Sequence, residues 1–357
     1  MSKTIIVGMS GGVDSSVTAL LLKREGYQVI GLFMKNWEEK DENGVCTSTK
    51  DYEDVARTCD LLKIPYYSVN FVKEYQSLVF QEFLNECKLG LTPNPDVLCN
   101  REIKFKVLLD KALSLGGDFL ATGHYARTQD GLLLKGSDPD KDQSYFLHAV
   151  PSSALNKALF PVGHLKKPEV RRIAKEAGIP VHDKKDSTGI CFIGKRNFKG
   201  FVSGYLGFTP GPMVDLKGKM LGEHDGLAYY TIGQRKGLML GGEGEPWYVM
   251  GKDTVNNRLI IDRGKEHPAL YAEELFAKDP IWIGKSPKEF PFSCTAKIRY
   301  RQVDQSCTIL DNKDGKLRVR FKEAQRAITP GQSIVFYNGD ICLGGAKILF
   351  GQKNPGV

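Results

Sequence analysis

The first two hundred residues alternate short apolar runs with longer stretches in which apolar residues recur at helical spacing. The apolar runs predict buried strands at residues 5–8, 29–34, 66–70 and 119–122. The periodic stretches predict helices at residues 15–24, 52–62, 75–87, 104–115 and 168–177. Strands and helices in this order are typical of an α/β domain built on a doubly wound parallel sheet.

The pattern changes after about residue 205, where glycine and proline become dense and the helical periodicity disappears. Short β-like runs follow at 228–232, 247–250 and 258–261. Longer alternating runs occupy 294–300, 306–310, 317–321, 333–337 and 341–348, and turn residues separate them. We therefore expect an α/β domain over 1–205, a small β-rich central module over 206–269, and a C-terminal β-barrel of five or six strands over 270–357.

A glycine turn, Ser10-Gly11-Gly12-Val13-Asp14-Ser15-Ser16, stands between the first predicted strand and the first helix. Glycines let backbone N–H groups approach a ligand, and a helix start adds unpaired donors, so the turn suits a phosphate. Asp14 fits beside phosphate if a cation such as Mg²⁺ lies between them, or if it caps the helix. The turn has neither the lysine of a Walker A loop nor the G-x-G-x-x-G spacing. An ordinary strand–turn–helix corner is the alternative.

The turn resembles the PP-loop of ATP pyrophosphatases, which split ATP between the α and β phosphates and adenylate a substrate oxygen. Ligands of parallel sheets bind outside the carboxyl ends of the strands, where residues 34 and 123 also lie. The resemblance implies an ATP site made by Gly8, Met9, Ser10, Gly11, Gly12, Val13, Asp14, Ser15, Met34 and Gly123.

The eight cysteines are scattered, with no C-x-x-C pair and no spacing that suits zinc, so we expect no protein-held metal. Cys59, Cys294, Cys307 and Cys342 fall in helix or strand patterns and are expected in the core. Cys99 follows two prolines, which predict a loop with a helix starting at about residue 100. A thiol at a helix start has a lowered pKa and is reactive. A structural loop with an incidental thiol is the alternative.

The chain carries a net charge of +8, concentrated in its last quarter. Residues 285–326 hold eleven Lys or Arg against five Asp or Glu, a balance that suits a polyanion such as RNA. A solvated face, with balancing acids elsewhere, is the alternative. No apolar run reaches the ~18–20 residues of a membrane span, and the first strand follows the N-terminus at once. These features predict a cytoplasmic protein without a membrane partner.

The segments SGGVDSS, NPDVLCN, ATGHYAR, KDQSYFL, DSTGICFIG, GQRKGL, RYRQ and TPGQ occur in the order seen in tRNA-specific 2-thiouridylases. The resemblance covers nearly the whole chain, and it departs from the family at Met239-Leu240, where a glycine is usual at the first position. It implies that ATP adenylates the C2 oxygen of the wobble uridine in a tRNA anticodon. A persulfide sulfur then displaces AMP and leaves 2-thiouridine.

The resemblance also assigns roles to single residues. It implies that Cys191 carries the persulfide and that a sulfur-donor protein loads it. It also implies that Cys99 is a second catalytic thiol, which attacks the persulfide and either leaves a Cys99–Cys191 disulfide or frees sulfide. Asp96 is implied as a general acid or base. The segment implied to contact the target base is Asn94, Pro95 and Asp96. Contacts with tRNA are implied at His124, Lys141, Asp142, Gln143, Arg299, Tyr300 and Gln332.

Two other functions remain open from the residues. A different PP-loop adenylating enzyme, either another tRNA thiolase or an amide-forming ligase, would also use the glycine turn. An amide-forming ligase needs neither the cysteine pair nor a basic barrel. A non-enzymatic RNA-binding protein that holds ATP as a structural ligand would have no use for Asp14, Cys99 and Cys191 together.

Overall fold

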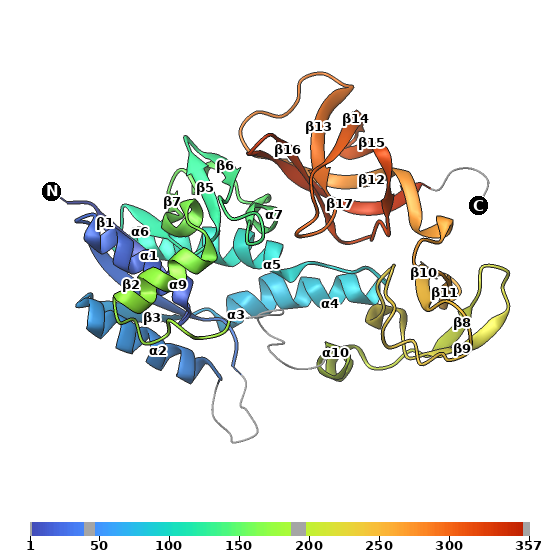
Figure 1. The fold of residues 1–357 in the computed structure, drawn as a ribbon, viewed down its shortest axis with the longest axis horizontal. Helices are drawn as coiled ribbons and strands as arrows, with labels where there is room; N and C mark the ends of the chain where they lie inside the picture. Colours follow the sequence, from blue (N-terminus) through green and yellow to red (C-terminus); the bar gives the residue numbers. More distant parts are fainter. Residues whose placement is uncertain (1, 39–46, 187–197, 353–357) are drawn as a thin grey trace.

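The computed structural model describes residues 2–38, 47–186 and 198–352, which form three parts (Figure 1). The first part is a five-stranded sheet in the order β3-β2-β1-β4-β7, and every pairing in it is parallel. Its strands are β1 (Thr4–Met9), β2 (Gln28–Lys35), β3 (Tyr66–Asn70), β4 (Phe119–Ala121) and β7 (Ala158–Leu159). The predicted α/β fold with a parallel sheet is confirmed.

Helices cover both faces of this sheet because the side chains of β1 alternate between two apolar clusters. Ile5, Val7 and Met9 pack in one cluster, with α1 (Val13–Arg24), α2 (Thr47–Leu62) and α9 (Lys167–Glu176). Ile6 packs in the other, with a set of helices that follow one another along the chain. These are α3 (Val72–Tyr75), the π-helix η1 (Gln76–Phe80), α4 (Gln81–Lys88), α5 (Pro95–Leu98), the π-helix η2 (Cys99–Leu108) and α6 (Leu109–Ser114).

The helix expected to start at about residue 100 in fact begins at Pro95, so the predicted loop is wrong there. Proline is tolerated at the first helical position, where its missing N–H would have had no partner. Asn94 is the N-cap, and its side-chain oxygen accepts a hydrogen bond of 3.2 Å from the Asp96 N–H. The chain then continues through α5, η2 and α6 to Ser114 without a gap.

The remaining elements of the first part are short. They are the hairpin β5 (Ala126–Gln129) and β6 (Leu132–Lys135), then α7 (Ser144–Leu147), α8 (Ser152–Leu155) and η3 (Pro161–His164). The helix α10 (Phe198–Leu206) leads from this part into the central module. Within the described ranges, no helix combines the length and apolar character that crossing a membrane requires.

The central module is a four-stranded sheet in the order β10-β11-β8-β9. Its strands are β8 (Gly211–Val214), β9 (Met220–His224), β10 (Trp247–Asp253) and β11 (Arg258–Arg263). The strand expected at 228–232 is wrong, because that stretch contains the 3-10 turn η4 (Leu227–Tyr229). Gly226 and Gly233 flank the run at φ +146° and φ +82°, and such backbone bends an apolar run out of an extended strand.

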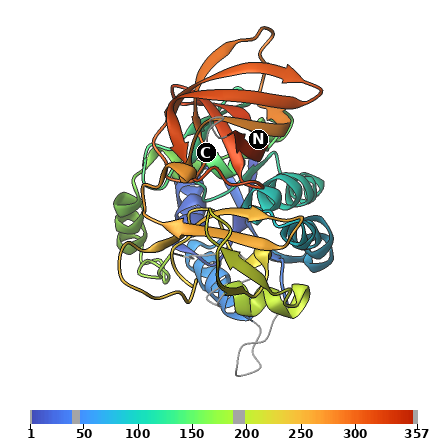
Figure 2. The same cartoon turned by 90° about the vertical axis from the view of Figure 1, so that its right-hand side faces the viewer.

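The C-terminal part is a closed barrel of six strands, as predicted. They are β12 (Tyr271–Trp282), β13 (Phe292–Lys297), β14 (Gln305–Lys313), β15 (Lys316–Arg326), β16 (Ser333–Asn338) and β17 (Ile341–Gln352), after the short turn η5 (Pro268–Leu270). The pairing of β12 with β17 closes the barrel. The β5–β6 hairpin adds to β17 and joins the first part to the barrel. Figures 1 and 2 both place the barrel above the level of α4 and the yellow-green α10 below it.

Candidate active site

The glycine turn lies at the carboxyl end of β1 and opens directly into α1, whose N-cap is Gly12. Gly11 has φ +72°, and a Cβ at this position would stand 2.6 Å from the Asp51 carbonyl oxygen. At Gly12, the one atom of the described residues that a Cβ would meet is the Ser10 hydroxyl, at 3.5 Å, so among these residues the space above Gly12 is open. The structure gives the N-cap residue, Gly12, no side-chain cap for α1 within the part of the chain that it describes. The first-turn N–H groups of such a helix lack protein partners and suit a phosphate.

Serine side chains brace this loop. The Ser15 hydroxyl donates to the Gly12 carbonyl at 3.1 Å and accepts from the Ser10 N–H at 3.2 Å. The Ser16 hydroxyl donates to the same carbonyl at 2.9 Å. Met9 and Val13 point into the core, so they offer a ligand only backbone groups. Ser10 is the exposed member, and its hydroxyl lies 3.2 Å from the Ser15 hydroxyl.

The other predicted nucleotide neighbours lie at the same edge of the sheet. Gly8 and Met34 stand near the carboxyl ends of β1 and β2, and Gly123 follows β4, which is the other neighbour of β1. A Cβ at Gly123 would stand 2.8 Å from the Ser15 nitrogen, so only glycine lets this loop approach the first turn of α1. The structure thus brings the predicted ATP-site residues together.

The Asp14 side chain contacts two side chains from later in the chain, Tyr125 and Lys167. Its carboxylate accepts hydrogen bonds from the Lys167 ammonium at 2.7 and 2.8 Å and from the Tyr125 hydroxyl at 2.7 Å. The capping interpretation is wrong, because the N-cap is Gly12. Lys167 supplies one cation beside Asp14, and a Mg²⁺ between Asp14 and phosphate stays a prediction. Burial and the neighbouring Asp14 raise the pKa of Tyr125, which keeps this hydroxyl a donor.

Lys167 also belongs to a network of ion pairs centred on Asp186, the last described residue before Cys191. The Asp186 carboxylate contacts the cations of Lys167 at 2.8 Å, Arg171 at 2.8 Å and Lys141 at 2.7 Å. Burial would raise the pKa of Asp186, but hydrogen bonds from Lys141 and Lys167 outweigh it and lower the pKa to about 2. The sequence does not identify Lys167 as a site residue. The one signal for it is that Asp14, beside a phosphate site, needs a neighbouring cation.

A second lysine, Lys184, lies between α9 and Asp186 and contacts the glycine turn itself. Lys184 donates to the Gly11 carbonyl at 2.9 Å and contacts Asp51 at 2.8 Å and Asp54 at 2.7 Å. The Arg171 guanidinium donates hydrogen bonds to the backbone carbonyls of His182 and Lys184. The residues just before the undescribed range 187–197 are therefore held against the glycine turn, which we also call the nucleotide loop.

The donor set of the site does not fit a metal ion held by the protein. Among the residues that the structure describes, no group of three or more His, Cys, Asp or Glu side chains is placed to bind one. Both oxygens of Asp14 already accept hydrogen bonds from protein donors.

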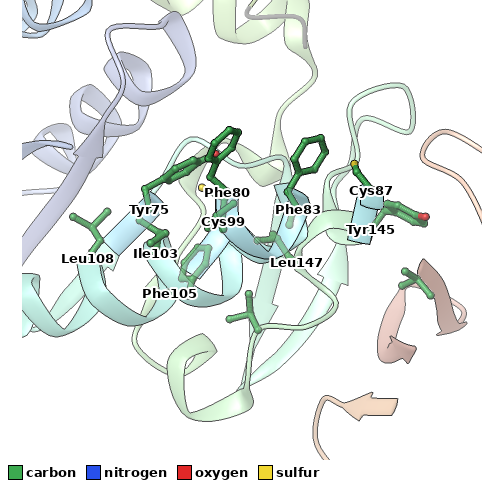
Figure 3. Close-up of a cluster of buried hydrophobic side chains, with 14 of the residues drawn as sticks. Tyr75, Phe80, Phe83, Cys87, Cys99, Ile103, Phe105, Leu108, Tyr145 and Leu147 are labelled. Carbon is green, nitrogen blue, oxygen red and sulfur yellow. The ribbon is translucent and has the colours of Figure 1, made fainter. Parts of the chain in front are cut away.

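Asp96 and Cys99 lie on one face of the helix that begins at Pro95, because they are three residues apart. Cys99 is only 4% exposed and belongs to the apolar cluster that contains Tyr75 and Phe80 (Figure 3). The expectation of a thiol in a polar loop is wrong, because Cys99 lies within the continuous helical segment and is buried. Its reactivity stays a prediction. Burial raises the pKa of Asp96, and the nearby Lys104 opposes this. Cys191 lies outside the described residues, so its pairing with Cys99 stays a prediction.

His124 is buried, and both nitrogens of its ring have a partner. Its Nδ1 lies 2.7 Å from the Thr122 hydroxyl, and its Nε2 lies 3.3 Å from the Lys104 ammonium. Because an ammonium can only donate, Nε2 accepts and the ring proton lies on Nδ1. Burial and Lys104 hold the pKa of His124 well below its usual range, so the ring is neutral. A tRNA contact at His124 stays a prediction.

The three side chains at 141–143, where tRNA contacts are predicted, make hydrogen bonds or ion pairs within the protein. The buried Asp142 accepts from the Gly136 and Ser144 N–H groups at 3.0 and 3.1 Å and lies 3.4 Å from Lys297 of the barrel. Gln143 accepts from the Tyr125 N–H at 2.9 Å. Lys141 is half-exposed and contacts Asp186. Contacts with RNA at these three residues stay a prediction.

The barrel positions Arg299, Tyr300 and Gln332 are half-buried. The Arg299 guanidinium donates to the Ala327 carbonyl at 2.6 Å, and the Tyr300 ring packs 4.5 Å from that of Phe146. The Gln332 amide donates to the Thr92 carbonyl at 2.6 Å, and the Thr92 N–H donates to the Pro330 carbonyl at 2.9 Å. The barrel therefore holds the backbone just before Asn94, Pro95 and Asp96.

Three family models match the chain in sequence. Residues 3–195 match the tRNA methyl transferase HUP domain, residues 199–263 the tRNA methyl transferase PRC-barrel domain, and residues 272–348 the aminomethyltransferase beta-barrel domain. Among solved structures, the NMN synthetase from Francisella tularensis has a TM-score of 0.36 at 17% identity, and covers 56% of this chain and 72% of its own. A 4-thiouridine synthetase–RNA complex with bound ATP has a TM-score of 0.37 at 16% identity, and covers 54% of this chain and 46% of its own.

The curated relatives match over almost their full length. The tRNA-specific 2-thiouridylase MnmA of Halalkalibacterium halodurans is 58% identical over 348 residues, which are 96% of this chain and 94% of that protein. The protein of the same name from Exiguobacterium sibiricum is 58% identical over 349 residues, 97% of this chain and 93% of that protein. With the nucleotide loop in place at the sheet edge, these matches show that the chain belongs to the tRNA-specific 2-thiouridylase family.

Proposed function

We propose that this protein is an ATP-dependent tRNA sulfurtransferase, which replaces the C2 oxygen of the wobble uridine with sulfur. The observation that carries the proposal is the 58% identity, over 96% of the chain, to proteins named tRNA-specific 2-thiouridylase. The open phosphate site at the start of α1 supports it, because activation of an oxygen by ATP needs such a site.

The first step activates the uridine. The C2 oxygen attacks the α-phosphorus of ATP, a new P–O bond forms, and the bond to the β-phosphate breaks to release pyrophosphate. The N–H groups at Gly11 and Gly12 hold the phosphates. Lys167 and Asp14 fix the first turn of α1, so that these donors are in place before ATP arrives. If Mg²⁺ accompanies ATP, the phosphate oxygens rather than a protein cluster would bind it.

The second step exchanges oxygen for sulfur. The terminal sulfur of a Cys191 persulfide, loaded by a sulfur-donor protein, attacks C2, and AMP leaves with the former C2 oxygen. The Cys99 thiol attacks Cys191 and breaks the S–S bond, which leaves a Cys99–Cys191 disulfide for a cellular thiol to reduce. Asp96, whose pKa is raised by burial, is suited to exchange a proton with the base during these steps.

Pyrophosphate release tests this function against its alternatives. The protein is incubated with ATP, and with tRNA that carries either uridine or cytidine at the wobble position. We expect pyrophosphate only with the uridine tRNA. Release without tRNA would favour an amide-forming ligase, whereas no release with any tRNA would favour an RNA-binding protein. Cys99→Ser and Cys191→Ser variants should keep tRNA binding and lose thiolation.

A further inference from the structure

A cavity of about 510 Å³ lies between the first part and the central module, away from the nucleotide loop. Its walls come from α4, the segment 91–93, α10 and residues 228–237 of the central module. Phe83, Phe198, Tyr229 and Tyr230 contribute aromatic side chains to the wall, of which Phe83, Tyr229 and Tyr230 are largely buried, and Lys199 and Lys236 contribute positive charge. A cavity of this size holds a small organic group, and the volume suits a nucleobase with its ribose.

We propose that this cavity takes an unstacked base of the tRNA anticodon loop next to the wobble uridine. The inference deepens the proposed function and rests on it. Single-stranded RNA is recognised by aromatic rings that stack on splayed bases and by cations that contact the backbone. The cavity offers both in one place.

The aromatic walls come from three separate elements. The rings of Phe83 on α4 and Phe198 on α10 meet edge to face, with centroids 6.2 Å apart. Tyr229 lies on η4 of the central module, and its hydroxyl is held by the Gly207 carbonyl. Lys199 pairs with Asp225, whereas Lys236 is exposed beside the equally exposed Arg235. The charge that an RNA phosphate would meet at the rim is therefore positive.

The cavity borders the predicted site of chemistry. Thr92 and Pro93 form part of its wall, and the next residues along the chain are Asn94, Pro95 and Asp96. The barrel fixes this wall through the hydrogen bond from Gln332 to Thr92. Phe83 stacks on Phe80 with centroids 6.4 Å apart, and Phe80 belongs to the cluster that contains Cys99. The cavity and the predicted site of chemistry are therefore contiguous along the chain and share this apolar cluster.

Cys87 also lines the cavity, but its chemistry does not favour sulfur transfer there. Burial raises the pKa of this thiol to about 12, although Lys252 acts in the opposite direction. A thiol that stays protonated at neutral pH is a poor nucleophile. The cavity is therefore suited to binding, not to a second sulfur relay.

Anticodon stem–loop RNAs with one abasic nucleotide at each loop position test the proposal. For the wild-type protein, loss of one base next to the wobble position should raise Kd about tenfold, the scale of one base–aromatic stacking contact. In the Ala228→Trp variant, where an indole fills the cavity, the same abasic change should have no effect. Lys236→Ala should weaken RNA binding more than Lys219→Ala, a matched exposed lysine of the same module.

Circular dichroism and the thermal midpoint establish that the variants are folded. The proposal is overturned if abasic positions affect Ala228→Trp as they affect the wild type, or if Lys236→Ala binds RNA no more weakly than Lys219→Ala. It is also overturned if filling the cavity stops sulfur loading but leaves RNA binding unchanged. The same wild-type preparation is also assayed for thiolation of full-length tRNA. If it does not thiolate tRNA, the proposed function is refuted. If it does, a negative result with the variants refutes the cavity proposal alone.

Discussion

Removing the Lys167 ammonium is the sharpest structural perturbation of the nucleotide loop. In Lys167→Met, the apolar stem remains and the charge is lost. Asp14 would then keep only the Tyr125 hydroxyl, while Asp186 would keep Arg171 and Lys141. The first turn of α1 would thus carry a stranded carboxylate.

The expected cost follows from burial. The Lys167 side chain is 9% exposed, whereas those of Asp14 and Asp186 are 30% and 29% exposed. Breaking a fully buried ion pair costs about 3–5 kcal/mol, and breaking an exposed pair costs about 0–1 kcal/mol. A value of about 2 kcal/mol lies between these limits and corresponds to roughly 30-fold faster opening of α1.

Hydrogen exchange of peptides that cover α1 measures this opening in the intact protein. The control is Lys175→Met, an exposed position on the same helix α9. Adding Asp14→Asn to Lys167→Met should restore part of the protection, because it removes the stranded charge. If α1 exchanges no faster in Lys167→Met than in Lys175→Met, the ion pair does not hold the loop.

Three further outcomes follow from single contacts. Gly11→Ala should abolish ATP binding in a calorimetric titration, because its Cβ would stand 2.6 Å from the Asp51 carbonyl at φ +72°; binding within twofold of wild type would contradict this. Gln332→Leu removes the donor to Thr92, which costs about 1–3 kcal/mol, so kcat should fall about tenfold at unchanged tRNA Kd; a change in Kd alone would make it an RNA contact only. Burial lowers the pKa of His148 to about 4, against the hydrogen bond to the Tyr145 carbonyl, so the unfolded chain binds an extra proton below pH ~6.5. Stability is therefore lost as the pH falls from ~6.5 towards 4, by about 2 kcal/mol at pH 5, and urea unfolding of His148→Gln should lack this part of the pH dependence.

The glycine turn and the parallel strands could be predicted because both are encoded locally. A buried strand, two glycines and a helix start stand next to one another in the sequence, and β1, β2 and β4 do meet at one edge. The barrel strands could be predicted for the same reason, because apolar residues alternate with polar ones along each of them.

The contacts between distant segments could not be read in this way. Lys167 reaches Asp14 across 153 positions, and Gln332 reaches Thr92 across 240. Nothing in their local sequence marks these residues as partners. The basic segment gave a similarly incomplete picture, since Arg318 and Arg320 pair with Glu274 on the neighbouring strand β12. The setting of Cys99 is equally hard to predict, because a proline that is excluded from a helix interior can begin a helix, as Pro95 begins α5.

Mass spectrometry of tRNA treated with the protein, ATP and a sulfide source tests the central claim most directly. The account predicts that the wobble uridine alone gains the mass of one sulfur in place of one oxygen, and that no gain occurs without ATP. A tRNA with no mass change, or with sulfur at a different nucleotide, would contradict it.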